Sequence, residues 1–170
     1  CMNVDQVKKK ITKKTKAIVP VHFTGYMTNM PKLLKISKKY KLPIVEDACQ
    51  SILGSINNQN AGTWGEFGAF SLHPLKNINV WSDGGIITTN KLSHYKKLIL
   101  LRNHGLSDRD TVKICGYNSR LDTFQAVVGN WLLPRAKKIA AQRIMNAKYF
   151  DNNFSKINEI EIPPRPKNFK

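Results

Sequence analysis

An apolar segment, a segment with helical spacing and a second apolar segment follow one another early in the chain. Residues 17–22 read Ala-Ile-Val-Pro-Val-His and predict a buried strand, and residues 42–45 predict a second strand. Between them, residues 30–40 carry Met30 and Leu33 on one side of an amphipathic helix. Two strands that are joined by a helix usually lie parallel in one sheet. We therefore expect an α/β fold whose functional groups gather at the carboxyl ends of parallel strands.

The remainder of the chain predicts shorter elements and one long helix. In chain order, the pattern predicts a helix from Asn3 to Ile11, a turn at 57–60, extended segments at 67–72 and 85–89, a helix at 92–101, a polar loop at 103–116 and a long helix at 121–154 that Pro134 interrupts. The proline-rich residues from 162 onward predict a linker. We find no internal repeat.

Length and composition limit the class of protein. The 170 residues, 41% of them hydrophobic, are enough to bury a core, and we expect one domain. No apolar stretch is long enough for a bilayer span, and residues 1–16 lack the apolar stretch of a secretory signal. The three cysteines lack the spacing of a disulfide framework or a metal site. These features predict a soluble, cytoplasmic protein with reduced cysteines, no metal and no membrane partner.

The formal net charge of +17 would suit a protein that neutralises nucleic-acid phosphates. Most of the cations, however, are lysines, and they cluster at 8–16 and 32–41 in the way typical of exposed helix faces and turns. No zinc finger, aromatic RNA-binding signature or glycine-rich RNA clamp accompanies them. We expect a solvated basic surface that attracts an anionic substrate, rather than a nucleic-acid partner.

One lysine lies in a segment that fits neither a solvated face nor a core. Lys76 belongs to residues 70–77, Phe-Ser-Leu-His-Pro-Leu-Lys-Asn, and the apolar run at 43–45 ends in Glu46 and Asp47. A lysine, an acid and a hydroxyl at neighbouring strand ends are the parts of a Schiff-base site. Pyridoxal phosphate needs an amine for its aldehyde, a carboxylate for its ring nitrogen, and hydroxyl and amide donors for its phosphate. Lys76 supplies an amine, Asp47 a carboxylate and Ser71 a hydroxyl.

Six motifs in this chain together carry a family resemblance. They are residues 17–22, 46–50 (Glu-Asp-Ala-Cys-Gln), 70–77, 83–85 (Asp-Gly-Gly), 101–105 (Leu-Arg-Asn-His-Gly) and 116–122 (Gly-Tyr-Asn-Ser-Arg-Leu-Asp). In this order they resemble the DegT/DnrJ/EryC1/StrS family of sugar aminotransferases. The resemblance implies the aspartate-aminotransferase type of fold, a PLP-dependent transferase of fold type I, whose large domain has a mostly parallel sheet with flanking helices.

The resemblance also implies how much of a family member the chain represents. Complete members are longer on both sides, so we expect a central fragment, truncated at both ends. Residues 1–155 would form part of the PLP-binding large domain, and residues 156–170 a linker or the start of the small C-terminal domain. The glycine-rich phosphate-binding turn and the residue that stacks on the cofactor ring would lie outside this chain.

Individual residues acquire roles from the resemblance. Lys76 matches the catalytic lysine that holds the cofactor and moves a proton between the substrate and cofactor carbons. Asp47 matches the acid on the ring nitrogen, Gln50 the amide on the ring hydroxyl, and Ser71 a hydroxyl on the phosphate. Asn118 matches an asparagine that reaches the cofactor phosphate of the partner subunit, which implies a homodimer.

Each of these residues also has an ordinary structural interpretation, which the matched motifs outweigh. His22 lies at a strand end near the expected ring position, but a lone histidine there is more often structural, so we rank it below the other cofactor-binding candidates. Residues 102–104 belong to a matched motif without an assignable role. Trp81 stands where many members have small residues, and its bulk would reshape either the pocket or the dimer contact.

The resemblance leads to a functional hypothesis with two alternatives. We expect a PLP-dependent aminotransferase that transfers an amino group from an amino acid, commonly glutamate, to a nucleotide-linked keto sugar, for polysaccharide or amino-sugar biosynthesis. Some relatives replace the lysine with histidine and act as dehydratases, a branch that Lys76 disfavours. The second hypothesis is a noncatalytic fragment or interaction module. The third, ranked last, is a basic polyanion-binding domain.

Overall fold

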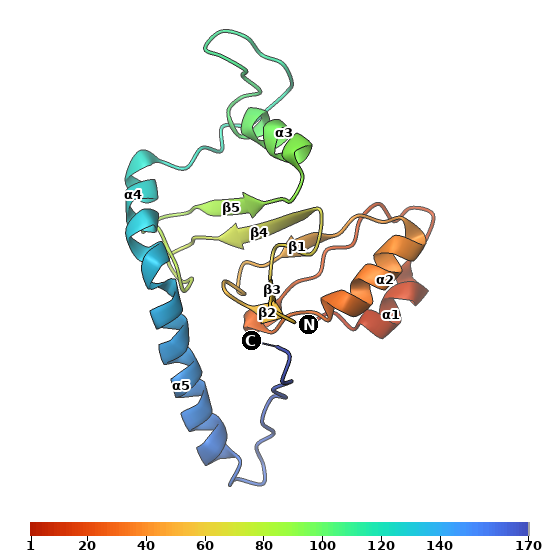
Figure 1. Cartoon of the computed structure of the whole chain (residues 1–170), viewed down its shortest axis with the longest axis vertical. Helices are drawn as coiled ribbons and strands as arrows, with labels where there is room; N and C mark the ends of the chain where they lie inside the picture. The colour runs from red at the N-terminus through yellow and green to blue at the C-terminus, as the bar shows by residue number, and fades with distance from the viewer. Residues whose placement is uncertain (170) are drawn as a thin grey trace.

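A computed structural model describes residues 1–169 (Figure 1). Its elements are α1 (Val4–Lys10), η1 (Phe23–Gly25), α2 (Met30–Tyr40), β1 (Val45–Asp47), β2 (Ser55–Ile56), β3 (Gln59–Asn60), β4 (Phe67–Ser71), β5 (Gly85–Thr88), α3 (Leu92–Arg102), α4 (Thr123–Leu132), η2 (Leu133–Arg135) and α5 (Ala136–Phe154). In Figure 1, α1 and α2 lie on one side of the central strands, and α4 and α5 lie on the other. The expected α/β fold is confirmed.

The central sheet has the strand order β1-β4-β5 and mixed direction. β1 and β4 are parallel, with Val45 opposite Phe67, whereas β5 runs antiparallel to β4, with Ile86 opposite Phe70. Because β1 and β4 are parallel, both end at the same edge of the sheet.

The segment at 17–22 is not the continuous buried strand that its composition predicts. It forms only two isolated parallel bridges with the β1 region, at Ile18 and at Val21. Between these bridges, Pro20 O accepts a hydrogen bond from Asp47 N at 2.9 Å, but proline has no N–H to return. Burial alternates as well, because Ile18 is buried whereas Val19 and Val21 are 52% and 40% exposed. The segment is therefore an edge with one buried face.

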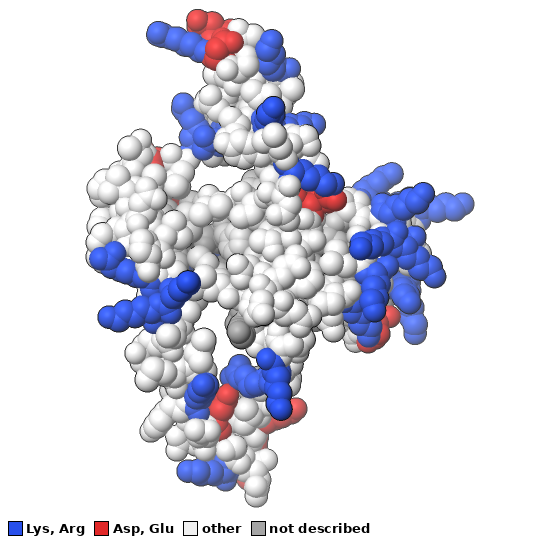
Figure 2. All heavy atoms as spheres, viewed as in Figure 1, with Lys and Arg blue, Asp and Glu red and all other residues white. Residues whose placement is uncertain are grey.

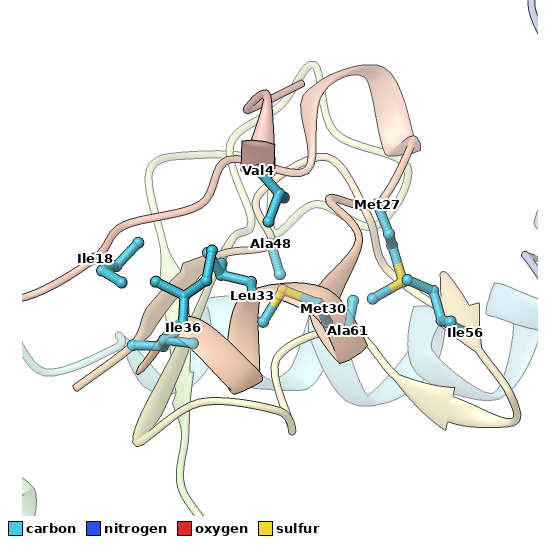
Figure 3. Packing of buried hydrophobic residues seen from close by; sticks show 10 residues of the cluster. Val4, Ile18, Met27, Met30, Leu33, Ile36, Ala48, Ile56 and Ala61 are labelled. Carbon is cyan, nitrogen blue, oxygen red and sulfur yellow. The ribbon is translucent and has the colours of Figure 1, made fainter. Parts of the chain in front are cut away.

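α2 matches the predicted amphipathic helix in both bounds. Asn29 caps it, because the Asn29 side chain accepts a hydrogen bond from Lys32 N at 3.1 Å. Met30, Leu33 and Ile36 lie on its buried face and pack in the main hydrophobic core, which also contains residues of α1, the β1 region and β2 (Figure 3). The predicted strand at 42–45 begins later than expected, since β1 covers Val45–Asp47.

The predicted turn at 57–60 joins two short strands into a hairpin. Asn57 and Asn58 take positive φ values of 51° and 63°, which asparagine tolerates and which suit a tight hairpin turn. The C-terminal tail returns to this hairpin, where Phe169 bridges to Ile56 and stacks on Tyr26 with ring centroids 5.6 Å apart. The predicted linker is therefore packed against the first third of the chain along its last described residues (Figure 1).

The long helix predicted at 121–154 is present, with its interruption at Pro134. Asp122 and Gln125 form a capping box that begins α4, and Pro134 lies in the short η2 turn between α4 and α5. A second core cluster contains Leu72, Ile78, Val80 and Ala136, and it holds the beginning of α5 against the segment that follows β4. No helix in the described part of the chain is long and apolar enough to cross a membrane.

Basic side chains are concentrated in the first quarter of the chain. All eleven lysines of residues 1–41 are exposed, and Asp5 is the only acid in that stretch. Figure 2 shows them as a dense group over α1 and α2. This arrangement agrees with the expected solvated basic surface.

Candidate active site

A cavity of about 620 Å³ opens at the carboxyl ends of β1 and β4, within the usual range of small-molecule sites. The segments that follow β1 and β4 form two of its walls, and one face of α5 forms another. Its polar and charged lining residues are Thr24, Gln50, Ser51, Ser71, Lys76, Asn77 and Arg143. The structure thus brings together three of the predicted site residues, Gln50, Ser71 and Lys76.

The backbone before Lys76 is held by local hydrogen bonds. Ser71 Oγ accepts a hydrogen bond from His73 N at 3.2 Å, and His73 Nδ1 accepts one from Leu75 N at 3.1 Å. Lys76 N donates to His73 O at 2.8 Å. These contacts form a compact turn directly after β4. The turn places the half-buried Lys76 at the cavity, while Leu75 is 87% exposed.

Asp47 lies at the end of β1, close to the cavity but not among its lining residues. Its Oδ1 accepts a hydrogen bond from Cys49 N at 3.1 Å. Burial raises the pKa of the Cys49 thiol, and the hydrogen bond and charge of Asp47 raise this pKa further, whereas the charge of Lys76 opposes the shift. The carboxylate of Asp47 and the amine of Lys76 therefore both act on one thiol at the cavity wall.

Gln50 and Ser71 present hydrogen-bond donors to the cavity. Gln50 Oε1 accepts a hydrogen bond from Thr24 N at 2.6 Å, which orients the side chain and leaves its amide NH₂ group to donate elsewhere. Ser71 Oγ acts as an acceptor toward His73, so its hydroxyl proton remains to be donated. Both groups suit an oxygen-rich ligand.

His22 is fully buried and does not line the cavity. Its Nδ1 accepts a hydrogen bond from Thr28 N at 3.3 Å, so Nε2 carries the proton and lies 3.0 Å from Glu46 Oε2. Both ring nitrogens are therefore used inside the protein. A role of His22 at a cofactor stays a prediction.

Glu46 organises this buried region, a role that little in the amino-acid sequence indicates. Its side chain is 0% exposed, and four donors converge on its two oxygens: His22 Nε2 and the backbone N–H groups of Gly62, Trp64 and Gly65, at 2.7–3.0 Å. A Cβ at Gly65 would lie 2.5 Å from Ile44 O, so only glycine lets the loop approach this closely. The only sign of a buried acid in the sequence is that two consecutive acids follow an apolar run. Neighbouring residues of a strand face opposite sides of the sheet, so one acid of such a pair faces the interior.

Asn118 lies elsewhere, in an exposed segment paired with the end of α3. Asn103 and Asn118 form an antiparallel bridge, and Tyr117 N donates to Leu101 O at 2.7 Å. Ser119 N donates to Arg102 O at 3.0 Å, and His104 N donates to Tyr117 O at 2.8 Å. Backbone hydrogen bonds thus join the motif at 101–105 to the motif at 116–122. The residue types of the two motifs did not predict this pairing.

An amine, an amide and a hydroxyl at adjoining strand ends are groups that suit pyridoxal phosphate, the cofactor of aminotransferases. The family model of the DegT/DnrJ/EryC1/StrS aminotransferase family matches residues 1–170, and the chain belongs to this family. Its fold is that of the PLP-dependent transferases of fold type I, as the resemblance implied.

Two relatives and one solved structure illustrate the similarity. The chain is 40% identical over 127 residues to a UDP-N-acetyl-3-dehydro-alpha-D-glucosamine 3-aminotransferase of Acidithiobacillus ferrooxidans, covering 75% of this chain and 34% of that protein. It is 34% identical over 166 residues to a dTDP-3-amino-3,4,6-trideoxy-alpha-D-glucose transaminase of Micromonospora megalomicea, covering 95% and 44%.

The solved structure is a DegT DnrJ EryC1 StrS aminotransferase from Brucella abortus, with a TM-score of 0.91 at 29% identity, covering 99% of this chain and 47% of that chain. The chain thus spans less than half the length of each of these three proteins.

Proposed function

We propose that the protein is a PLP-dependent aminotransferase that moves an amino group from an amino acid, glutamate in the first instance, to a keto sugar carried on a nucleotide. The observation that carries this proposal is the position of Lys76 in one cavity with Gln50 and Ser71, while Asp47 and Lys76 both act on Cys49 in the cavity wall. The names of the relatives support the acceptor class, since they specify UDP- and dTDP-linked sugars. The product would serve polysaccharide or amino-sugar biosynthesis.

The residues of the cavity fit the cofactor chemically. When bound, pyridoxal phosphate supplies an aldehyde that takes up amino groups and a ring that delocalises charge from the substrate carbon. Lys76 would hold the aldehyde and afterwards move the proton at its Nζ, and Asp47 would keep the ring nitrogen protonated. Gln50 would donate its amide proton to the ring hydroxyl, and Ser71 its hydroxyl proton to the phosphate.

The unpaired cysteines support a cytoplasmic location as part of this proposal. Cys1, Cys49 and Cys115 are all free thiols. Free thiols are the usual state in a reducing compartment.

Covalent trapping tests the proposed function directly. The full-length protein, incubated with pyridoxal phosphate, is expected to develop a visible absorbance band that borohydride removes. Mass spectrometry of the digested protein should then find the pyridoxyl group on the peptide that contains Lys76, because reduction makes the lysine–cofactor bond permanent. A folded protein without a band, or with the label spread over the exposed lysines of α1 and α2, would contradict the proposal.

We also propose a homodimer in which Asn118 acts on the partner's site. Three large apolar side chains support a protein interface: Trp81, Phe124 and Trp131 are 68%, 62% and 59% exposed. Trp81 and Phe124 touch, with ring centroids 5.7 Å apart, and neither of them lines the cavity. This favours the dimer contact over the pocket as the place where the bulk of Trp81 matters.

Mixing two inactive variants tests whether Asn118 acts across the interface. Lys76→Ala and Asn118→Ala subunits, co-expressed in the full-length protein, are expected to recover about a quarter of the wild-type activity. The reason is that random pairing makes half of the dimers mixed, and each mixed dimer keeps one site with both groups intact. Activity that stays at the level of the parent variants would instead place Asn118 in a loop role within its own subunit.

A further inference from the structure

Arg143 is a second cation in the wall of the cavity, and no sequence motif marks it. It lies on α5, opposite the segments that follow β1 and β4, and it lines the cavity together with Ala140 and Ala147 of the same helix. Ala140 and Ala147 lie one turn before and one turn after Arg143 on the same helix face. Within the described residues, Arg143 makes no hydrogen bond or ion pair.

The charge around Arg143 is unbalanced. The lining of the cavity contains two cations, Lys76 and Arg143, and no Asp or Glu among the described residues. Two like charges at one partly enclosed site both gain from an anion that lies between them. A guanidinium presents a planar fork of donors that matches a carboxylate or a phosphate in two hydrogen bonds.

This placement is not a consequence of the general lysine excess. α5 carries three further cations, Lys137, Lys138 and Lys148, and none of them lines the cavity. Arg143, although exposed, is therefore the one charged residue of this helix, within the described chain, that lines the cavity of Lys76.

We propose that Arg143 binds an oxyanion of the substrate while Lys76 performs the chemistry. The inference rests on the proposed function, which provides two oxyanions: the carboxylates of the amino-acid donor and the diphosphate of the nucleotide sugar. A guanidinium offers only hydrogen-bond donors, so Arg143 anchors the substrate without taking part in proton transfer. It is a specificity-determining residue for the anionic part of the substrate.

Binding of two substrate fragments tests this proposal and separates the two sources of the oxyanion. Glutarate stands for the carboxylates of the donor, and inorganic pyrophosphate stands for the diphosphate of the acceptor. Their affinities for the cofactor-loaded, full-length protein are measured by calorimetry in wild type, Arg143→Ala and Arg143→Lys. The matched control is Lys148→Ala, which removes one positive charge from an exposed position of the same helix outside the cavity.

One of the two fragments is expected to bind about 10- to 100-fold more weakly to Arg143→Ala, as for the loss of a hydrogen-bonded charged group. Arg143→Lys should restore part of the affinity, because it keeps the charge and loses the fork. Lys148→Ala should bind both fragments as wild type does. A selective loss of glutarate assigns Arg143 to the donor, and a selective loss of pyrophosphate assigns it to the acceptor. Unchanged affinity for both fragments would overturn the proposal.

The absorbance band of the bound cofactor keeps this result separate from the proposed function. A wild-type protein without the band contradicts the proposed function itself. A further outcome is that the band forms equally in wild type and both Arg143 variants while all three proteins bind glutarate and pyrophosphate with the same affinity. In that case only the assignment of Arg143 to the substrate is wrong. If folded Arg143 variants lose the band, the residue acts on the cofactor, and its assignment to the substrate is wrong.

Discussion

Replacing Lys76 with Ala is expected to abolish transamination in the full-length protein while leaving the fold intact. Turnover should fall by at least about 10²- to 10⁴-fold, the range for the loss of a positioned acid–base group, since the variant also loses its covalent hold on the cofactor. The fold should survive because the side chain of Lys76 is only half-buried and makes no hydrogen bond or ion pair within the described residues. Steady-state kinetics and circular dichroism measure the two effects.

A small amine provides a sharper version of this experiment. Added methylamine should restore part of the turnover of Lys76→Ala, because the space left by the side chain lies at a cavity that is open to solutes. Lys97→Ala serves as the control, since Lys97 is exposed on α3 and does not line the cavity. It should keep wild-type activity. Turnover of Lys76→Ala near the wild-type rate, without any added amine, would contradict the assignment of Lys76 as the catalytic residue.

Replacing Glu46 with Ala is expected to cause the largest loss of stability among single substitutions at the site. The change removes the acceptor of the buried His22 and Gly62 donors and of the partly buried backbone N–H groups of Trp64 and Gly65. Each orphaned group costs about 1–3 kcal/mol, so the loss of an acceptor for four donors costs roughly 4–12 kcal/mol. The sum is comparable to the whole stability of an ordinary domain, about 5–15 kcal/mol. Urea unfolding and soluble yield of the full-length protein provide the measurement.

The neighbouring acid supplies a matched control for Glu46. Asp47→Asn changes a carboxylate one residue away that is partly exposed, and its remaining carbonyl oxygen can still accept the hydrogen bond from Cys49 N. Its unfolding free energy should therefore stay within about 1 kcal/mol of wild type, the effect expected for one modest hydrogen bond. Glu46→Gln should remain destabilised, because its NH₂ group would face backbone N–H donors. If Glu46→Ala unfolds at the same urea concentration as Asp47→Asn, the proposed role of the buried network is wrong.

Several elements could be predicted from sequence because their causes are local. α2 begins after Asn29 because a side chain caps neighbouring N–H groups, and the hairpin turn forms where two asparagines accept positive φ. Pro134 interrupts the long helix because it lacks an N–H. Lys76 could be selected because its flanking residues match a family motif, although its place in the cavity could not be derived from that motif.

The predictions that failed, or that could not be made, depend on contacts between distant segments. The segment at 17–22 has the composition of a strand, but its pairing depends on the segment that lies beside it. There Pro20 accepts one hydrogen bond and has no N–H to donate in return. The antiparallel direction of β5 depends on the path of the chain between β4 and β5, which hydrophobic spacing does not encode. The packed C-terminal tail depends on a surface near Tyr26 and Ile56, more than 100 residues earlier in the chain.

The sequence by itself determined the α/β class, most helix bounds, the basic surface and the lysine at the centre of the proposed chemistry. Each follows from side chains within a few residues of one another, through capping, spacing or a contiguous motif. Only the tertiary structure decided that Glu46 collects four donors, that Asn118 pairs with Asn103, and that Arg143 faces the cavity of Lys76. The physical reason is that these contacts join residues far apart in the chain, and packing of the core selects them rather than local propensity.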